Sequence, residues 1–327
     1  MNTFPFKFEP YLKSVIWGGE KIARFKGITI AQTSIGESWE LSGVPGHESV
    51  CAERGIPDDP NLGLTLPALI EKYGATLVGA QNFAHFGTEF PLLVKFIDSR
   101  QDLSIQVHPN DELAVKRHHC AGKTEMWYVI NTESGARIYT GLKKPITPDD
   151  YERLAHTEVR EGENPFADVI ASYESHAGDV FFLPAGRIHA IGAGNLLAEI
   201  QQTSDITYRV CDYGRRDAEG RTRQLHVEEA KQAIDYQVHP DYRTSYDQSQ
   251  PSVELVSCPY FTVRRERIDG QAHLDYHCDS FVIVVCLSGE VVVNGIKARQ
   301  GETLLVPACA NALDIHGHAT LLTAFTM

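Results

Sequence analysis

Four side chains of the kinds that bind metal ions stand in three strand-like segments of this sequence. Gln106 and His108 lie two residues apart in SIQVHPND, and Glu125 opens the apolar run EMWYV. Because residues i and i+2 of a strand point to the same face, Gln106 and His108 should project together. His189 closes the segment GDVFFLPAGRIH, in which Gly186 permits a tight turn that would aim the imidazole back towards the strands.

These residues would offer a cation two imidazole nitrogens and two oxygens, with no thiolate. A carboxylate that points into an apolar interior is costly without a partner, and a divalent cation is the strongest partner available. Mixed nitrogen and oxygen ligation suits Zn²⁺ in a catalytic site, and Mn²⁺, Co²⁺ or Fe²⁺ would also accept it. The residues therefore predict one metal ion, most simply Zn²⁺, with a position open for water or substrate.

Each candidate ligand also has a simpler explanation that the sequence leaves open. His189 could be a hydrogen-bonded turn histidine. Gln106 could bond only main-chain groups, since amides are uncommon zinc ligands. Glu125 could be the ion-pair partner of Lys123, two residues earlier in the chain.

Short strand-like segments between turn residues would have to position these side chains. Such segments, rich in β-branched and aromatic residues, cover 90–99, 103–109, 124–131, 136–142, 179–186, 195–202 and 205–214. Helical patterns are fewer, at 65–79, 147–156 and 226–236. The sequence predicts a mainly β fold with helical excursions.

One strand-and-turn unit occurs twice. GDVFFLPAG begins at Gly178 and GETLLVPAC begins at Gly301, an offset of 123 residues that suggests two copies of one β unit. The same offset pairs His189 with Ala312, so the second copy would lack this ligand. Because residues 237–252 are polar and resemble a linker, we expect a metal-bearing domain at 1–245 and a degenerate copy without metal ligands at 246–327.

Composition excludes several classes of protein. The net charge of −13 argues against nucleic-acid and anionic-membrane partners, although a small anionic substrate could still bind a local basic cluster. The seven cysteines are odd in number and form no CxxC pair, which indicates reduced thiols rather than a disulfide framework. No signal-peptide core and no 18-residue apolar run occurs, so we expect a cytoplasmic protein.

The chain resembles the type I mannose-6-phosphate isomerases in their short bacterial form. The resemblance rests on VIWGG, GESWELS, LSIQVHPND, GKTEMWYV and FFLPAGRIHAIGAGNLLAEIQQTSDITYRVCDYGR, which recur in the family's order. It implies two cupin domains, that is, jelly-roll β-barrels, of which the second is degenerate. It also implies a zinc-dependent aldose–ketose isomerase that interconverts mannose 6-phosphate and fructose 6-phosphate through an enediol, as a monomer or a homodimer.

The resemblance also assigns the site residues. It places Gln106, His108, Glu125 and His189 on the metal positions, and it implies catalytic roles for Arg209, Lys123, Glu199 and Asp205. For substrate binding, position in or near the motifs adds Lys123, Arg209, Arg187 and Trp17, the last as one rim of the pocket. Two points stay open: Glu199 is preferred to Lys123 as the base but could only orient its neighbours, and Trp17 could simply pack.

Two other classes of function compete with the isomerase. A cupin dioxygenase with Fe²⁺ would use the same ligand types, and a non-catalytic sugar-binding cupin would need no metal chemistry. Gln106 in place of a histidine ligand and the pair Lys123 and Arg209 argue against the dioxygenase. Ligands are lost only in the second copy, which argues against the binding protein.

Overall fold

The computed structural model describes residues 4–29, 31–216, 219–310 and 312–326. The chain folds into two compact units. We call Val15–Gly19 with Ile97–Arg243 the central unit, and Met1–Ser14, Glu20–Phe96 and Thr244–Met327 the terminal unit. Strands β2 (Tyr11–Gly19) and β5 (Leu92–Ser99) each run from one unit into the other. The prediction of a mainly β fold is confirmed.

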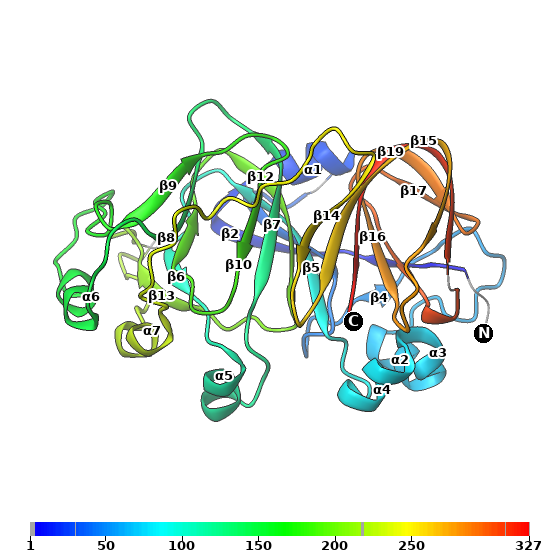
Figure 1. The fold of residues 1–327 in the computed structure, drawn as a ribbon, viewed down its shortest axis with the longest axis horizontal. Coiled ribbons are helices and arrows are strands. Elements are labelled where there is room, and N and C mark those ends of the chain that lie inside the picture. The colour runs from blue at the N-terminus through cyan, green and yellow to red at the C-terminus, as the bar shows by residue number, and fades with distance from the viewer. Residues whose placement is uncertain (1–3, 30, 217–218, 311, 327) are drawn as a thin grey trace. The chain divides into compact units, whose positions relative to one another are not determined.

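Two antiparallel sheets build the central unit (Figure 1). The first has the order β13-β6-β11-β8-β9, with β13 at Tyr208–Cys211, β6 at Ile105–Val107, β11 at His189–Ile191, β8 at Arg137–Leu142 and β9 at Ile170–Glu174. The second contains β10 (Val180–Leu183), β7 (Glu125–Thr132) and β12 (Asn195–Gln202), followed by β5. Most of these strands lie in the predicted segments, but β9 and β11 were not predicted. Strand β11 has only three residues, too few to show a clear alternation.

Alternation along the first sheet separates an inner face from an outer face. Ile105 and Val107 of β6 pack outwards against the cluster that includes Tyr151 and Ala230 of two covering helices. The opposite face is lined by a second apolar cluster with members from both sheets: Trp17, Ile97, Leu103, Trp127, Val129, Ile138, Phe181, Leu183, Ile191 and Leu197. The side chain of Gln106, between two outward-facing neighbours, therefore points to the inner face.

Among its described residues, the central unit contains the helices α5 (Asp111–His118), α6 (Pro148–Ala155) and α7 (Val227–Ala233). The Thr147 and Asp150 side chains form a capping box that starts α6, within the helix predicted at 147–156. The terminal unit holds α1 (Lys21–Lys26), α2 (Leu66–Tyr73), α3 (Ala75–Val78) and α4 (Ala80–Phe86). Among the described residues, no helix is long and apolar enough to cross a membrane.

One predicted helix is divided, and three helices were not predicted. The segment 65–79 forms α2 and α3 rather than one helix, because Gly74 between them adopts a φ of 51° that interrupts the helical path. The sequence analysis missed α1, α4 and α5. Two of them, α4 and α5, bury no large apolar side chain that would mark a helical face.

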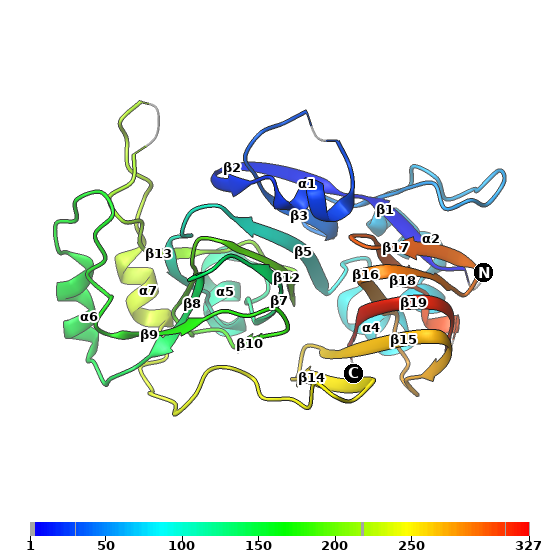
Figure 2. The same cartoon turned by 90° about the horizontal axis from the view of Figure 1, so that it is seen from above.

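An eight-stranded sheet dominates the terminal unit (Figure 2). Its order is β14-β15-β19-β16-β18-β1-β4, with β17 paired to β16. The strands are β14 (Ser252–Ser257), β15 (Thr262–Asp275), β19 (Ala312–Phe325), β16 (Val282–Val293), β18 (Thr303–Val306), β1 (Phe6–Glu9), β4 (Val50–Cys51) and β17 (Ile296–Arg299). Strand β3 (Ile35–Leu41) pairs with β2 and β5, and a short 3₁₀ turn covers Ala308–Ala310.

The compact units differ from the predicted domains, 1–245 and 246–327, in where the first part of the chain belongs. The change of unit after Arg243 lies close to the predicted boundary. Most of the first 96 residues, however, fold with the C-terminal segment, because β1 pairs with β18 and Asn82 donates a hydrogen bond to the Ser280 hydroxyl. Such pairing across almost the whole chain leaves no local signal in the sequence.

The predicted repeat is visible in the strands. Strand β10 and strand β18 begin and end at positions that differ by 123 residues, as do the first residues of β11 and β19. Both pairs follow the repeated letters of the sequence. Each unit therefore contains one copy of the strand and turn.

The predicted linker begins with an ordered segment. Residues 235–243, which we call the strap, have no regular secondary structure, yet the Tyr242 side chain is only 5% exposed. Its hydroxyl accepts hydrogen bonds from the amides of Leu142 (3.1 Å) and His239 (3.0 Å), and it donates to the Leu142 carbonyl (2.9 Å). One phenol thus closes the end of β8 and holds the strap.

The strap also holds the turn that leads into β11. The amide of Asp235 donates to the Gly186 carbonyl (2.7 Å), and the amide of Gly186 donates to the His108 carbonyl (2.9 Å). A Cβ on Gly186 would lie 2.9 Å from the Ala233 carbonyl, just before the strap, so glycine is needed for this close approach. The Arg187 guanidinium lies 4.9 Å from the centre of the Tyr242 ring. The turn is fixed from two sides.

We predict that Tyr242→Phe destabilises the protein more than Tyr236→Phe. The first change removes a hydroxyl that bonds three main-chain groups, two of Leu142 and one of His239, whereas the Tyr236 hydroxyl makes one bond, to the Lys231 carbonyl. The expected loss in the free energy of unfolding is about 1–3 kcal/mol for Tyr242→Phe and about 1 kcal/mol or less for the control. Urea unfolding followed by fluorescence measures both, and equal losses would contradict the role of the strap.

Candidate metal centre

Three side chains from three strand ends meet at the inner face of the central unit. His108 follows β6, Glu125 begins β7 and His189 begins β11. Glu125 Oε2 lies 3.6 Å from His108 Nε2, and Glu125 Oε1 lies 3.4 Å from His189 Nε2. All three residues are buried, and within the described ranges they form the group of histidine and acidic residues that could hold a metal ion.

Both imidazoles are held in the tautomer that a metal ligand requires. His108 Nδ1 lies 2.8 Å from the Ile206 carbonyl oxygen, and His189 Nδ1 lies 2.8 Å from the Arg187 carbonyl oxygen. Because a carbonyl oxygen only accepts, each Nδ1 carries the proton and donates it. In the neutral rings each Nε2 therefore presents a lone pair towards Glu125. The hydrogen bond at Nδ1 fixes the orientation of the ring.

The environment also keeps His189 neutral. Burial disfavours the charged imidazolium and lowers the pKa of His189 from its ordinary 6.5 to about 3, and the positive charge of Lys123 acts in the same direction. The hydrogen bond to the Arg187 carbonyl opposes this shift. A neutral ring at physiological pH is the form that coordinates a cation.

Gln106 lies directly across from His189 in the sheet. The two residues are register partners on β6 and β11, and Gln106 Nε2 lies 3.3 Å from His189 Nε2. Since residues directly opposite in an antiparallel pair share a face, the row Arg209–Gln106–His189–Thr140 runs across the inner face of four strands. The predicted candidate Gln106 is therefore at the cluster, with its amide group beside a ligand nitrogen.

Lys123 joins the cluster from the residue pair before β7. Its ammonium lies 2.6 Å from Glu125 Oε2, 3.1 Å from His108 Nε2 and 3.9 Å from Glu199 Oε1. The Trp127 indole N–H donates to Glu199 Oε2 at 2.8 Å. Lys123 and Glu199 are at most 5% exposed, so the site holds two carboxylates, one ammonium and two imidazoles in a nearly water-free space.

Arg209 approaches the site from β13. It is the register partner of Gln106, and one Nη donates to the Gln224 carbonyl at 2.8 Å. Burial lowers its pKa, and the charge of the neighbouring Arg223 adds to that effect. The guanidinium is half-buried, which places a fixed positive charge between the inner face and solvent.

Three predicted residues have other surroundings. Asp205 is exposed in the loop between β12 and β13. Trp17 is 5% exposed and packs in the inner apolar cluster, the alternative that the sequence left open. The Arg187 guanidinium donates to the Phe182 carbonyl at 2.7 Å and stacks on Tyr242, so its contacts fix the turn before His189. The substrate-binding roles of Arg187 and Trp17 and the catalytic role of Asp205 stay predictions.

Sequence reasoning missed one residue that touches the site. Trp127 orients Glu199 and meets the His189 ring edge-on, with ring centres 5.3 Å apart. A signal was present, because Trp127 follows Glu125 by two residues and must share its face. What the sequence did not give is the register that sets Glu199 opposite Trp127 on β12.

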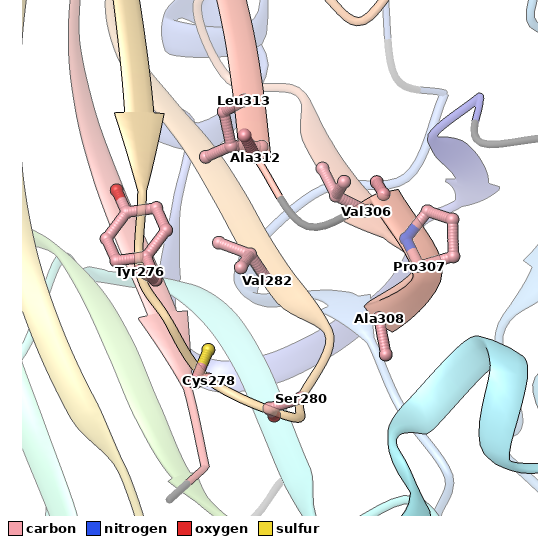
Figure 3. A pocket seen from close by; sticks show the side chains of 10 residues that line it. Tyr276, Cys278, Ser280, Val282, Val306, Pro307, Ala308, Ala312 and Leu313 are labelled. Carbon is pink, nitrogen blue, oxygen red and sulfur yellow. The ribbon is translucent and has the colours of Figure 1, made fainter.

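The corresponding place in the terminal unit has a different lining. A cavity of about 10 Å³, close to the size of one water, lies at the start of β19. Figure 3 shows the side chains that line it. Ala312 occupies the position related to His189 by the repeat. The residues around this cavity offer a phenol, a thiol and a hydroxyl but no imidazole or carboxylate: Tyr276, Cys278, Ser280, Val282, Val306, Pro307, Ala308, Ala310, Ala312 and Leu313.

Comparisons with known proteins agree with this geometry. Residues 5–132 match the family described as phosphomannose isomerase type I, catalytic domain, and residues 252–326 match the mannose-6-phosphate isomerase cupin domain. The mannose-6-phosphate isomerase ManA of Bacillus subtilis is 33% identical over 99% of both chains. The mannose-6-phosphate isomerase of Streptococcus mutans is 31% identical over 98% of both.

Comparison with solved structures identifies the same family of proteins. The crystal structure of the Bacillus subtilis mannose 6-phosphate isomerase superposes with a TM-score of 0.83 at 29% identity, covering 98% of this chain and 99% of that one. A mannose 6-phosphate isomerase solved with zinc and yttrium bound has a TM-score of 0.80 at 16% identity over 98% of this chain and 99% of that one. The predicted cupin fold is thereby confirmed, and the chain is an enzyme that belongs to the type I mannose-6-phosphate isomerase family.

Proposed function

We propose that this chain is a metal-dependent aldose–ketose isomerase that interconverts mannose 6-phosphate and fructose 6-phosphate through an enediol intermediate. The observation that carries the proposal is the buried group of His108, Glu125 and His189, with Lys123 and Glu199 beside it. Family membership argues against the two alternatives, an iron-dependent dioxygenase and a non-catalytic sugar-binding cupin.

The metal would be held by the Nε2 atoms of His108 and His189 and by the Glu125 carboxylate, with Gln106 as the fourth ligand. The donor set fits a divalent cation, because both Nε2 lone pairs and the carboxylate converge in one buried space. When bound, such an ion supplies Lewis acidity that polarises the substrate's hydroxyl and carbonyl oxygens. Zinc is the preferred ion, and a fold relative solved with zinc bound supports this choice.

The isomerisation moves a proton between C2 and C1, so it needs a base near those carbons. We assign this role to Glu199, a buried carboxylate that the Trp127 indole and the Lys123 ammonium hold in place. Lys123, as an ammonium, would stabilise the negative charge that develops on O1 or O2. Asp205, exposed in the loop before β13, stays a candidate for assisting ring opening.

Arg209 would supply the second fixed positive charge. It lies on the face of the metal group, is half-buried, and is held at its guanidinium by the Gln224 carbonyl. A charge that is already oriented stabilises an enediolate or a phosphate without reorganisation. The sugar phosphate would thus meet Lys123 and Arg209 at the site.

A coupled assay tests the proposed function. Purified protein loaded with Zn²⁺, and separately with Mn²⁺ or Co²⁺, is given mannose 6-phosphate, and the fructose 6-phosphate formed is measured. We expect turnover that a chelator abolishes and that added metal restores. No turnover with any of the three ions would contradict the proposal, and oxygen consumption by the Fe²⁺ form would favour the dioxygenase.

We predict that His189→Ala lowers the metal content to well below one ion per chain. The variant removes one of the two imidazole nitrogens. The ligands that remain, His108 and Glu125 with Gln106, are too few to hold the ion tightly. Elemental analysis after dialysis measures the loss. His176→Ala is the control, because that histidine lies on the surface of the same unit, and it should keep its metal.

We predict that Arg209→Ala keeps its metal but loses most of its turnover. Arg209 is not one of the proposed metal ligands, whereas loss of an oriented charge costs about 10²–10³-fold in kcat. Steady-state kinetics with elemental analysis separates the two effects. Arg221→Ala, an exposed arginine of the same unit, is the control, and parallel loss of metal and kcat in Arg209→Ala would contradict the assignment.

A further inference from the structure

A three-residue segment holds Arg209 at both its main chain and its side chain. The amide of His226 donates to the Arg209 carbonyl (2.8 Å), and the amide of Arg209 donates to His226 Nδ1 (3.0 Å). The Arg209 guanidinium donates to the Gln224 carbonyl (2.8 Å). Since β13 is the edge strand of its sheet, the imidazole nitrogen takes the place of the carbonyl that a further strand would supply.

The local structure around His226 does not by itself call for a histidine. His226 is the N-cap residue of α7, yet its side chain makes no hydrogen bond to the helix. Ser, Asp, Asn and Thr are preferred at this position because their short side chains accept from the first turn. The side chain turns to Arg209 instead, so its contact with the edge strand is what the histidine provides.

The contact requires one protonation state of the ring. An amide only donates, so Nδ1 must be unprotonated, and the ring proton of neutral His226 lies on Nε2. A protonated ring would carry N–H at both nitrogens and would face the Arg209 amide donor to donor. The hydrogen bond therefore exists only with the neutral ring.

The charged and titratable groups around His226 come from three elements. Arg209 and Tyr208 face it from β13, Glu229 from α7 and His118 from α5. Burial lowers the pKa of His226, the positive charges of Arg209 and His118 add to this, and Glu229 opposes it. The surroundings thus favour the neutral ring at physiological pH.

We propose that His226 is a positioning residue that holds Arg209 in its working position through the Nδ1 hydrogen bond to the Arg209 amide. The inference rests on the proposed function of Arg209. His226 bonds the main chain of Arg209 at the free edge of β13 and acts through Arg209, so it is not itself a catalytic residue. Its loss should lower kcat, because a shift of about 1 Å in a charged group can cost about 10²-fold.

Three variants test the proposal by kinetics: His226→Ala, His226→Asn and the control His156→Ala. In the Asn variant, Oδ1 can occupy the place of Nδ1 and accept from the Arg209 amide without titrating. We expect kcat to fall about 10- to 100-fold in His226→Ala. Metal content should stay unchanged, and Asn should restore kcat to within about threefold of the native value. His156, at the exposed end of α6, should have no effect.

A structural role alone would give a different result. If His226 only stabilised α7, both variants would change the unfolding midpoint and leave kcat of the folded protein unchanged, which would overturn the proposal. An Asn variant as slow as the Ala variant would also overturn it, because the acceptor would then not be what matters.

A second measurement does not depend on activity. In ¹⁵N-labelled protein, NMR should show His226 Nδ1 as the unprotonated nitrogen at neutral pH, and the Arg209 amide resonance should titrate together with the His226 ring on acidification. If no isomerase activity is found, the proposed function fails while this coupling still stands. A protonated Nδ1 at neutral pH, or an Arg209 amide that does not follow the ring, would overturn the positioning role.

Discussion

The site depends on the burial of ionisable groups that cannot be buried alone. Glu125, Glu199 and Lys123 are each at most 5% exposed, at the end of an apolar space between two sheets. Removing a carboxylate or an ammonium from water costs several kcal/mol per ion unless other groups compensate. Two carboxylates against one ammonium leave a negative balance. A divalent cation bound at the proposed site would offset this balance.

Contacts with segments far along the chain fix the positions of His189 and Arg209. The turn before His189 is held by the strap, through the Asp235 amide and the Tyr242 ring, from some fifty residues further along the chain. In the same way, the segment after residue 223 holds Arg209. In both cases irregular backbone fixes a side chain that a strand presents. The strands supply the direction of the side chains, and the connecting segments supply the accuracy that a reactive site needs.

Most strands of the central unit, and the segments that carry the candidate ligands, could be predicted from the sequence because they follow from local rules. Alternation puts Gln106 and His108 on one face, and Glu125 begins an apolar run that had to be a buried strand. Trp17 and Arg187 were harder, because an indole in a motif can pack or bind, and a guanidinium in a turn can point to either side. Only the tertiary structure shows the Tyr242 ring under Arg187.

The sequence also could not reveal relations set by pairing between distant segments. The N-terminal strand β1 completes a sheet made mostly of the last quarter of the chain, so the compact units do not follow chain order. The strand pairs that bring Glu199 to Trp127 and Arg209 to Gln106 contain register shifts, between Leu196 and Leu197 and between Arg209 and Cys211, that no local pattern predicts. The short helices lacked a periodic signal, and α7 was found only because its apolar face is regular.

The two imidazole–carbonyl hydrogen bonds have a consequence for how a cation would bind at the proposed site. Most histidine sites must lose protons before a metal enters, so their affinity weakens as the medium acidifies. Here the Ile206 and Arg187 carbonyls fix the proton on Nδ1 of each ring, and burial keeps His189 uncharged well below neutrality. The His189 ring would release no proton when an ion arrives. Metal binding by His189 would then depend on the metal concentration and little on moderate changes in pH.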